Sequence, residues 1–290
     1  MLKALLGLTL TKDETKTVEL TPVAGTTRLN VHIHNGEIAV RTWDQPHVQA
    51  EIRVRIRGDE KAPMENFWKL RQFGSEVKFE QEHTHSWFLG PHVRIDVTLN
   101  VPAALTSAYL KTHNGFIEVE MFNGDVDAHT SNGALRIVDV EGKVEAHTHN
   151  GHVEILRIDG PVDVTSHNGM LDLDKVTEKI NAHTHNGQVL LRDCGQSVTV
   201  STHNGQIKVN QQVQLQGTWS LNTSNGSVEM RVPTNTDAMY KLHTSAGRIT
   251  GNALPVQTSG FSQKLTVTTG QGTNLIDIHT SAGGIEVNHS

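Results

Sequence analysis

Twelve of the 18 histidines of this chain recur at two fixed positions of one short motif. In residues 146–155, AHTHNGHVEI, these positions are held by His147 and His149, and an Asn-Gly pair follows. Imidazoles at such spacing can share a Zn²⁺, Ni²⁺ or Cu²⁺ ion, or they can simply tolerate an exposed position beside a turn. The first position holds His32, His129, His147, His183, His243 and His279, and the second holds His34, His113, His149, His167, His185 and His203.

The glycines that follow these histidines mark an internal repeat. Six of them are separated by steps of 18 residues: Gly115, Gly133, Gly151, Gly169, Gly187 and Gly205. Two equal and slightly longer steps lead on to Gly226 and Gly247, and Gly283 lies two further steps of the original length along the chain. Gly36 belongs to an outlying copy. A fixed period of this length is typical of repeat architectures.

Each unit contains two runs in which apolar and polar residues alternate. In one unit, Val153 and Ile155 form the first run, and Val162 and Val164 form the second run after a turn at residues 159–161. Alternation with a period of two predicts strands that have one buried face. The sequence therefore predicts an all-β protein.

Two topologies could use such units. Asn-Gly between alternating strands is a strong hairpin signal, so an antiparallel meander is one alternative. The fixed register favours a β-solenoid instead, because stacked coils constrain equivalent positions alike. A threonine that recurs three residues before the glycine fits this second topology. We predict a parallel β-helix with 18-residue coils, in which the corner asparagines adopt a left-handed conformation and stack their amides.

The histidines are predicted to lie on one outer face of the solenoid. Ala146 and Thr148 point inward, so the intervening His147 and the following His149 point outward. Equivalent side chains of stacked coils would lie about 4.8 Å apart. The candidate metal ligands are His147, His149, His167, His183, His185 and His203, with the acidic residues Asp127, Glu145 and Asp163 on the same face.

The same columns also contain residues that bind no metal. Ser131, Thr165 and Ser201 replace histidine in some coils, so the fold does not require a ligand at these positions. Divalent metal binding is therefore one interpretation of the pattern, and a histidine-decorated surface is the other. No cofactor is expected.

The segments before the array are less regular. Residues 26–58 and 75–102 contain alternating runs that predict longer strands capping one end. Between them, residues 59–74 carry apolar side chains at helical spacing and predict a short capping helix. We expect an N-terminal part at 1–102 and a solenoid at 103–290, continuous within one domain. Residues 1–14 predict a first strand or lead-in, with a signal peptide as the alternative.

Composition excludes several classes of function. A net charge of −6 and 4% aromatic residues argue against nucleic-acid binding. The single cysteine, Cys194, falls at an inward position and cannot support a disulfide framework. No run is long and apolar enough for a membrane helix. We expect a cytoplasmic location, with association with the cell envelope as the alternative.

Four pieces of the chain resemble the bacterial putative-adhesin family of β-strand-repeat domains, originally a domain of unknown function. They are NGEIAVRTWDQPHVQAEI, VTLNVP…LKTHNG, VEMRVPTNTDAMYKLHTSAG and GTNLIDIHTSAGGIEV. The resemblance spans about residues 28–288 and implies a right-handed β-helix. It also implies a link to cell-envelope stress, which some relatives have. It supplies no catalytic residues.

Three functions are compatible with these features. The first is a non-enzymatic structural or interaction protein that binds other proteins, or copies of itself, through flat β-ladder faces. The second is a metal- or pH-responsive binder that uses the surface histidines. The third is a polysaccharide-acting β-helix enzyme, which would need an acidic cluster facing a groove.

Overall fold

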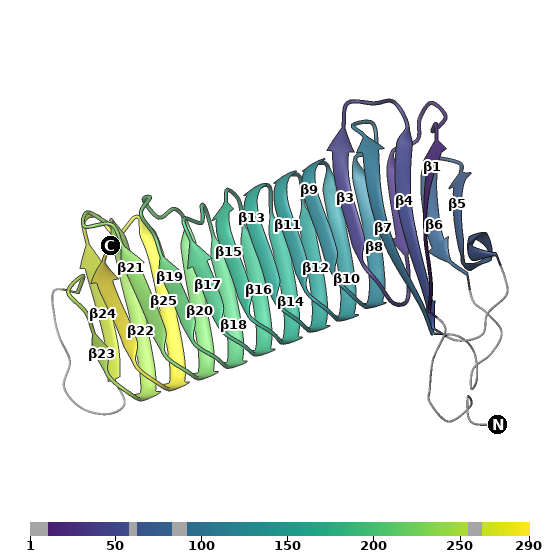
Figure 1. Cartoon of the computed structure of the whole chain (residues 1–290). Coiled ribbons are helices and arrows are strands. Elements are labelled where there is room, and N and C mark those ends of the chain that lie inside the picture. Colours follow the sequence, from purple (N-terminus) through teal and green to yellow (C-terminus); the bar gives the residue numbers. More distant parts are fainter. Residues whose placement is uncertain (1–10, 58–62, 83–91, 255–262) are drawn as a thin grey trace, which may run out of the picture.

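The computed structural model describes residues 11–57, 63–82, 92–254 and 263–290, and most of these residues lie in strands of two 13-stranded sheets (Figure 1). The first sheet has the order β1 (Thr11–Leu20), β4 (Val48–Arg57), β7 (His92–Pro102), β3 (Ile38–Trp43), β9 (Ile117–Asn123), β11 (Leu135–Glu141), β13 (Val153–Asp159), β15 (Leu171–Val176), β17 (Val189–Arg192), β19 (Ile207–Asn210), β21 (Val228–Val232), β26 (Ile285–His289) and β23 (Ile249–Thr250). The second sheet has the order β24 (Gln263–Thr269), β22 (Ala238–Ala246), β25 (Asn274–Ala282), β20 (Thr218–Asn225), β18 (Val198–Asn204), β16 (Ile180–Asn186), β14 (Val162–Asn168), β12 (Val144–Asn150), β10 (Asp125–Asn132), β8 (Ser107–Asn114), β2 (Arg28–His32), β6 (Glu76–Gln81) and β5 (Trp68–Phe73).

The predicted parallel, in-register stacking is confirmed. Val153 of β13 pairs in parallel with Leu135 of β11 and with Leu171 of β15, each one repeat away along the chain. It does not pair with the strand that precedes it across the Asn-Gly turn, as a meander would require. Each coil therefore contributes one strand to each sheet, and the protein is a β-solenoid.

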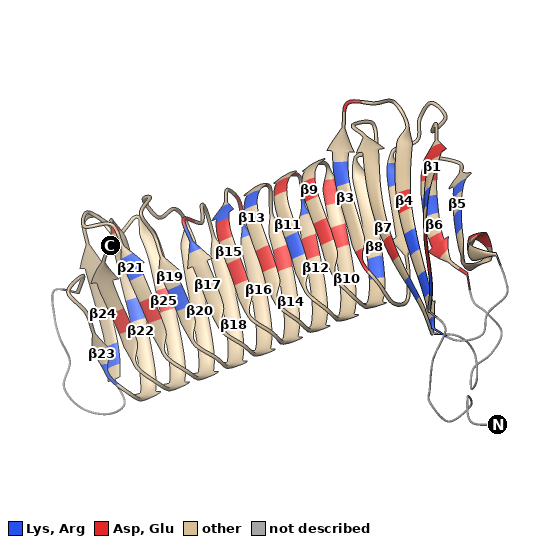
Figure 2. Ribbon diagram, in the orientation of Figure 1, with Lys and Arg blue, Asp and Glu red and all other residues tan. Residues whose placement is uncertain are grey.

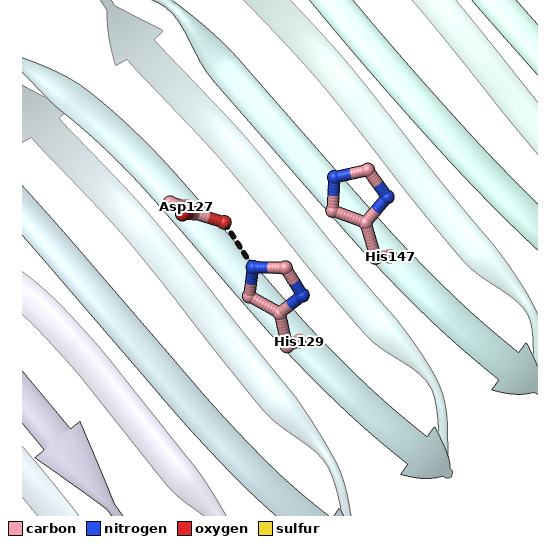
Figure 3. Close-up of side chains that lie close together, drawn as sticks. All are labelled: Asp127, His129 and His147. Carbon is pink, nitrogen blue, oxygen red and sulfur yellow. Dashed lines mark ion pairs between the residues drawn. The ribbon is translucent and has the colours of Figure 1, made fainter.

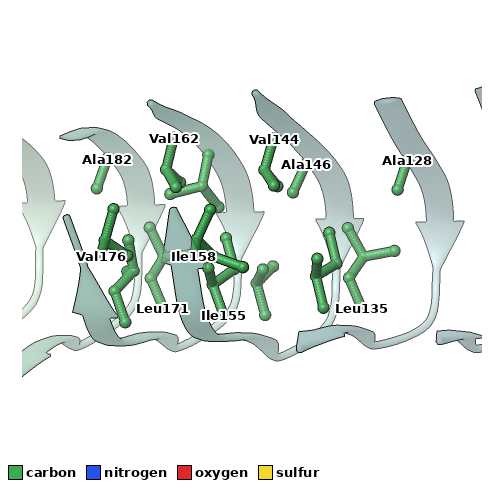
Figure 4. Close-up of a cluster of buried hydrophobic side chains, with 14 of the residues drawn as sticks. Ala128, Leu135, Val144, Ala146, Ile155, Ile158, Val162, Leu171, Val176 and Ala182 are labelled. Carbon is green, nitrogen blue, oxygen red and sulfur yellow. The ribbon is translucent and has the colours of Figure 1, made fainter. Parts of the chain in front are cut away.

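The core lies between the two sheets and is filled by the inward side chains of every coil (Figure 4). Val153, Ile155 and Ala146 are fully buried. The recurring threonine is buried as well, and in most coils its hydroxyl has a partner; the hydroxyls of Thr112 and Ser166 have none within the described residues. Thr148 Oγ1 donates a hydrogen bond to Gly133 O of the previous coil at 3.1 Å. A buried hydroxyl without such a partner would destabilise the fold.

The corner after each histidine strand is held by a ladder of asparagine amides. The Nδ2 group of each corner asparagine donates to Oδ1 of the asparagine in the adjoining coil, and the distance for Asn150 to Asn132 is 2.9 Å. The same bond joins the corner residues Asn35, Asn114, Asn132, Asn150, Asn168, Asn186, Asn204 and Asn225. The predicted amide stacking is confirmed.

The predicted left-handed backbone at this corner is wrong for the regular coils. Their positive φ angles lie at the opposite corner, for example at Arg157 (56°) and Gly160 (158°), whereas neither Asn150 nor Gly151 has one. Gly151 is required for a different reason. A Cβ atom there would lie 1.8 Å from Gly133 O, because the stacked backbones approach too closely for any side chain.

The predicted capping strands are present, but the predicted helix at 59–74 is not. Of that segment, residues 59–62 lie outside the described residues, and only Met64–Phe67 form a 3₁₀ turn, η1. Trp68–Phe73 forms the edge strand β5, which pairs with β6 across the turn at Gly74. Trp68 stacks on Phe79 at 6.0 Å between ring centroids. This tertiary contact outweighs the local helical spacing. Of the first strand or lead-in predicted at 1–14, residues 1–10 lie outside the described residues, and residues 11–14 belong to β1.

Stacking does not follow chain order at either end. The coil of β25 and β26, the last in sequence, lies between the coils of β20–β21 and β22–β23. At the other end, the coil of β2 and β3 contacts β8 and β9, while β6 and β7 pair on its outer side. The stack of regular coils predicted for residues 115–226 thus ends, on both sides, against coils that do not follow the order of the chain.

Candidate functional site: the histidine face of the second sheet

The outer face of the second sheet carries both histidine columns. On β12, Ala146 and Thr148 are buried, His147 is half-buried and His149 is exposed. The other repeats show the same alternation, so the predicted outward direction of both columns is confirmed. The parallel register then fixes which imidazoles can meet.

Four candidate ligands form one continuous stack, which we call the imidazole ladder: His149, His167, His185 and His203. The ring centroids of successive members lie 4.7, 4.9 and 5.0 Å apart, and the interplanar angles are 9° or less. All four side chains are exposed. Within the described residues, none of these rings has a hydrogen-bond or ion-pair partner. The ladder therefore presents a row of free ring nitrogens to solvent.

The remaining two candidates, His147 and His183, are not neighbours. Thr165 lies between them in the stack, and Ser201 lies on the far side of His183. His183 therefore has no imidazole above or below it in its own column. His147 instead stacks on His129 of the preceding coil, with centroids 4.8 Å apart and an interplanar angle of 19°.

His129 and His147 form a compact group with Asp127 (Figure 3). Asp127 Oδ1 lies 2.5 Å from His129 Nε2, and one potential ligand atom from each residue lies within 4.8 Å of the others. Burial lowers the pKa of His129 below its usual value, against the opposing charge of Asp127. The neutral imidazole is the form that binds metal ions.

Sequence reasoning placed these three residues on the correct face but did not group them. Asp127 was assigned to an acidic column and His129 to a histidine column. The spacing Asp-x-His on one strand was the available signal, since residues two apart on a strand share a face. The second histidine was predictable as well, because His147 follows His129 by one 18-residue repeat in the same column.

The outer face of the first sheet is different because its charges neutralise one another. Figure 2 shows Lys and Arg interleaved with Asp and Glu across β9, β11, β13 and β15. Arg136 contacts Glu120 at 2.7 Å, Glu118 at 3.0 Å and Glu154 at 3.2 Å. The hydrogen bond to Glu120 is the main cause of a raised pKa for Arg136. Similar pairs join Arg157 to Asp139, Arg192 to Asp172, and Lys208 to Glu229.

Cys194 lies in the core, as predicted, and is fully buried. Burial raises the pKa of its thiol to about 12. At pH 8 only about one thiol in ten thousand would then be ionised, and the thiolate is the reactive species. We expect no labelling of the folded protein by maleimide or iodoacetamide at that pH, and one equivalent after unfolding in guanidinium. Rapid labelling of the native chain would contradict this assignment.

Among the grooves on the described part of the surface, three are each lined by one carboxylate. The carboxylates are Asp193, Glu229 and Asp277. Glycoside hydrolysis normally requires two carboxyl groups on opposite sides of the scissile bond. None of these grooves provides that pair.

The comparisons with known proteins agree with the fold. Residues 28–288 match the Toastrack DUF4097 family. The chain belongs to this family. The match covers the same residues as the predicted resemblance to the putative-adhesin family and confirms a repeated-strand domain of unknown function. No curated protein matches the sequence of this Toastrack DUF4097 member.

Nine solved chains are similar to this Toastrack DUF4097 protein. A putative adhesin from Bacteroides fragilis is 9% identical, with 94% of this chain and 97% of that chain covered and a TM-score of 0.47. A putative lipid-binding protein from Parabacteroides distasonis is 14% identical, with 96% of each chain covered and a TM-score of 0.47. A putative adhesin from the same organism is 12% identical, with 76% and 97% covered and a TM-score of 0.43.

Across residues 11–57, 63–82, 92–254 and 263–290, no helix is long and apolar enough to cross a bilayer.

Proposed function

We propose that this chain is a non-enzymatic interaction protein that binds a protein partner through the outer face of the second sheet. The observation that carries the proposal is the imidazole ladder. It is a straight row of exposed rings whose nitrogens have no partner within the described residues. Each ring offers one donor and one acceptor when neutral, and two donors when protonated.

The contrast between the two faces supports this choice. On the first sheet, the guanidinium of Arg136 already contacts three carboxylates, and Arg192 contacts two. A partner would have to displace these internal pairs before it formed its own. On the second sheet, the ladder can accept a partner's hydroxyl, carboxylate or backbone groups without breaking any bond within the chain.

The chemistry of Cys194 and of the three grooves supports a binding role over an enzymatic one. Cys194 is buried and un-ionised at neutral pH, so it is a poor nucleophile. The grooves lack paired carboxylates. A flat ladder face also offers no enclosed cavity in which water could be excluded from a reaction.

The test compares chemical crosslinking of two variants with wild type in cells of the source organism. In the ladder variant, His149, His167, His185 and His203 are all replaced by serine, which already occupies this column at Ser131. In the control, Lys208→Ser and Glu229→Ser together remove an ion pair from the first sheet without changing net charge. We expect a crosslinked partner that wild type and control retain and that the ladder variant loses.

Two outcomes would redirect or refute the proposal. If sedimentation shows concentration-dependent dimers of the purified protein that the ladder variant abolishes, the partner is a second copy of the chain. If the ladder variant captures the same partner as wild type, the ladder is not the binding surface. A cytoplasmic location, with association with the cell envelope as the alternative, remains a prediction of the sequence.

A further inference from the structure

We propose that Asp127, His129 and His147 form a binding site for Zn²⁺ or another late first-row divalent cation. This inference does not rest on the proposed partner binding, because it concerns a different group of side chains beside the imidazole ladder.

The three residues converge because of strand geometry. Asp127 and His129 are two residues apart on β10, so they share its outer face. His147 is the direct register partner of His129 on the adjoining strand β12. As a result, their potential ligand atoms lie within 4.8 Å of one another.

Only a small movement would close this group around an ion. Nitrogen and oxygen ligands bind Zn²⁺ at about 2.0–2.2 Å, which places two ligands of a tetrahedral ion about 3.3 Å apart. Asp127 Oδ1 and His129 Nε2 are already closer than this, at 2.5 Å, and would separate slightly. Tilting the stacked rings of His129 and His147, which are both only partly buried, would provide the remaining approach.

The donor set selects the class of metal. Two imidazoles and one carboxylate suit Zn²⁺, Cu²⁺ or Ni²⁺, whereas Ca²⁺ and Mg²⁺ favour oxygen ligands. Asp127 supplies the negative charge that the imidazole ladder lacks. Because the site lies on an open face, it would leave at least one coordination position for water.

The neighbouring side chains confine the site to these three ligands. In the stack, Lys111 lies on the other side of His129 and Thr165 on the other side of His147. Glu145, the register partner of Asp127, is engaged by Lys143 at 2.6 Å. The column therefore offers one pair of imidazoles here rather than a continuous series.

The experiment is a titration of the purified whole chain with Zn²⁺ in competition with a chromophoric chelator. The ligand variants are Asp127→Asn and His147→Thr, the second of which introduces the residue that the next coil carries at Thr165. The control is His185→Ser, which removes an exposed imidazole from the middle of the ladder. Metal-free thermal melting verifies that all variants fold.

We expect wild type to bind one equivalent most tightly. Each ligand variant should weaken this event at least about tenfold, and the control should leave it unchanged. Co²⁺ added in place of Zn²⁺ should give visible d–d bands that change in the Asp127→Asn variant. Unchanged affinity in that variant, or loss of the tight event in the His185→Ser variant, would overturn the proposal. Because no partner is present in this assay, its failure would leave the proposed partner binding untouched.

Discussion

Gly151→Val is expected to lower the free energy of unfolding by more than about 4 kcal/mol. A Cβ atom at this position would lie 1.8 Å from Gly133 O and 2.5 Å from Gly133 C, and both are backbone atoms that no rotamer change can move. The two coils would have to separate. This separation would also stretch the hydrogen bond between the side-chain amides of Asn150 and Asn132 at the same corner. Urea denaturation monitored by circular dichroism measures the change.

Two controls isolate the cause. His149→Ala, two residues away, should change stability by no more than about 0.5 kcal/mol, because its side chain is exposed. Gly284→Val should cost far less than Gly151→Val, since a Cβ atom there meets only Arg248 O at 3.4 Å. Similar destabilisation by Gly151→Val and His149→Ala would mean that the glycine ladder is not closely packed.

The role of Gly151 illustrates what the sequence could and could not predict. Its recurrence once per repeat identified the coil and its register, because a solenoid constrains equivalent positions alike. The physical reason for the glycine was nevertheless misjudged. An Asn-Gly pair normally indicates a turn with positive φ. The close approach of Gly133 in the adjoining coil is a tertiary property, and no local pattern distinguishes the two causes.

The ends of the solenoid were predicted less well because the repeat itself is uniform. Every coil presents similar edges, so periodicity alone cannot specify that β25 inserts between β20 and β22. The segment before the array posed a different problem. β5 could be identified as a strand only through its partner β6 and the stacking of Trp68 on Phe79. Local spacing suggested a helix, and long-range pairing decided the outcome.

The candidate site, too, could be predicted from the sequence only in part. Alternation predicted that the histidines point outward, and the regular period predicted the ladder from His149 to His203. The cluster of Asp127, His129 and His147 was not predicted as a group. His129 has His147 on one side and Lys111 on the other, each one 18-residue repeat away, so the predicted stacking already defines these neighbours. The contact of Asp127 with His129 is a side-chain arrangement that the repeat does not specify. The candidate ligands therefore separate into a four-ring ladder, the cluster that contains His147, and an isolated His183.

Removing one complete coil is expected to leave a folded protein. Deletion of residues 147–164 takes out one full repeat and joins Ala146 to Thr165, which occupies the place of His147 in the register. Ser166 then replaces the buried Thr148, and Leu135 would stack on Leu171. Every inward position of the joined strand then holds an apolar residue or a small residue with a hydroxyl group. Because coils contact only their neighbours, the loss should be limited to one repeat and one interface.

A deletion that is shorter by a single residue is expected to prevent cooperative folding. Removing residues 147–163 joins Ala146 to Val164, so every following residue of that strand points to the opposite face. Val164 and Ser166 would leave their buried positions, and Asn168 would take the place of Gly151, where a Cβ atom would lie 1.8 Å from Gly133 O. The collision of this side chain with the stacked backbone, together with the lost packing, should cost more than about 3 kcal/mol. Thermal melts followed by far-ultraviolet circular dichroism compare the two deletions, which share one boundary and differ by one residue. Equal stability of both would show that the coils do not impose a fixed register on the chain.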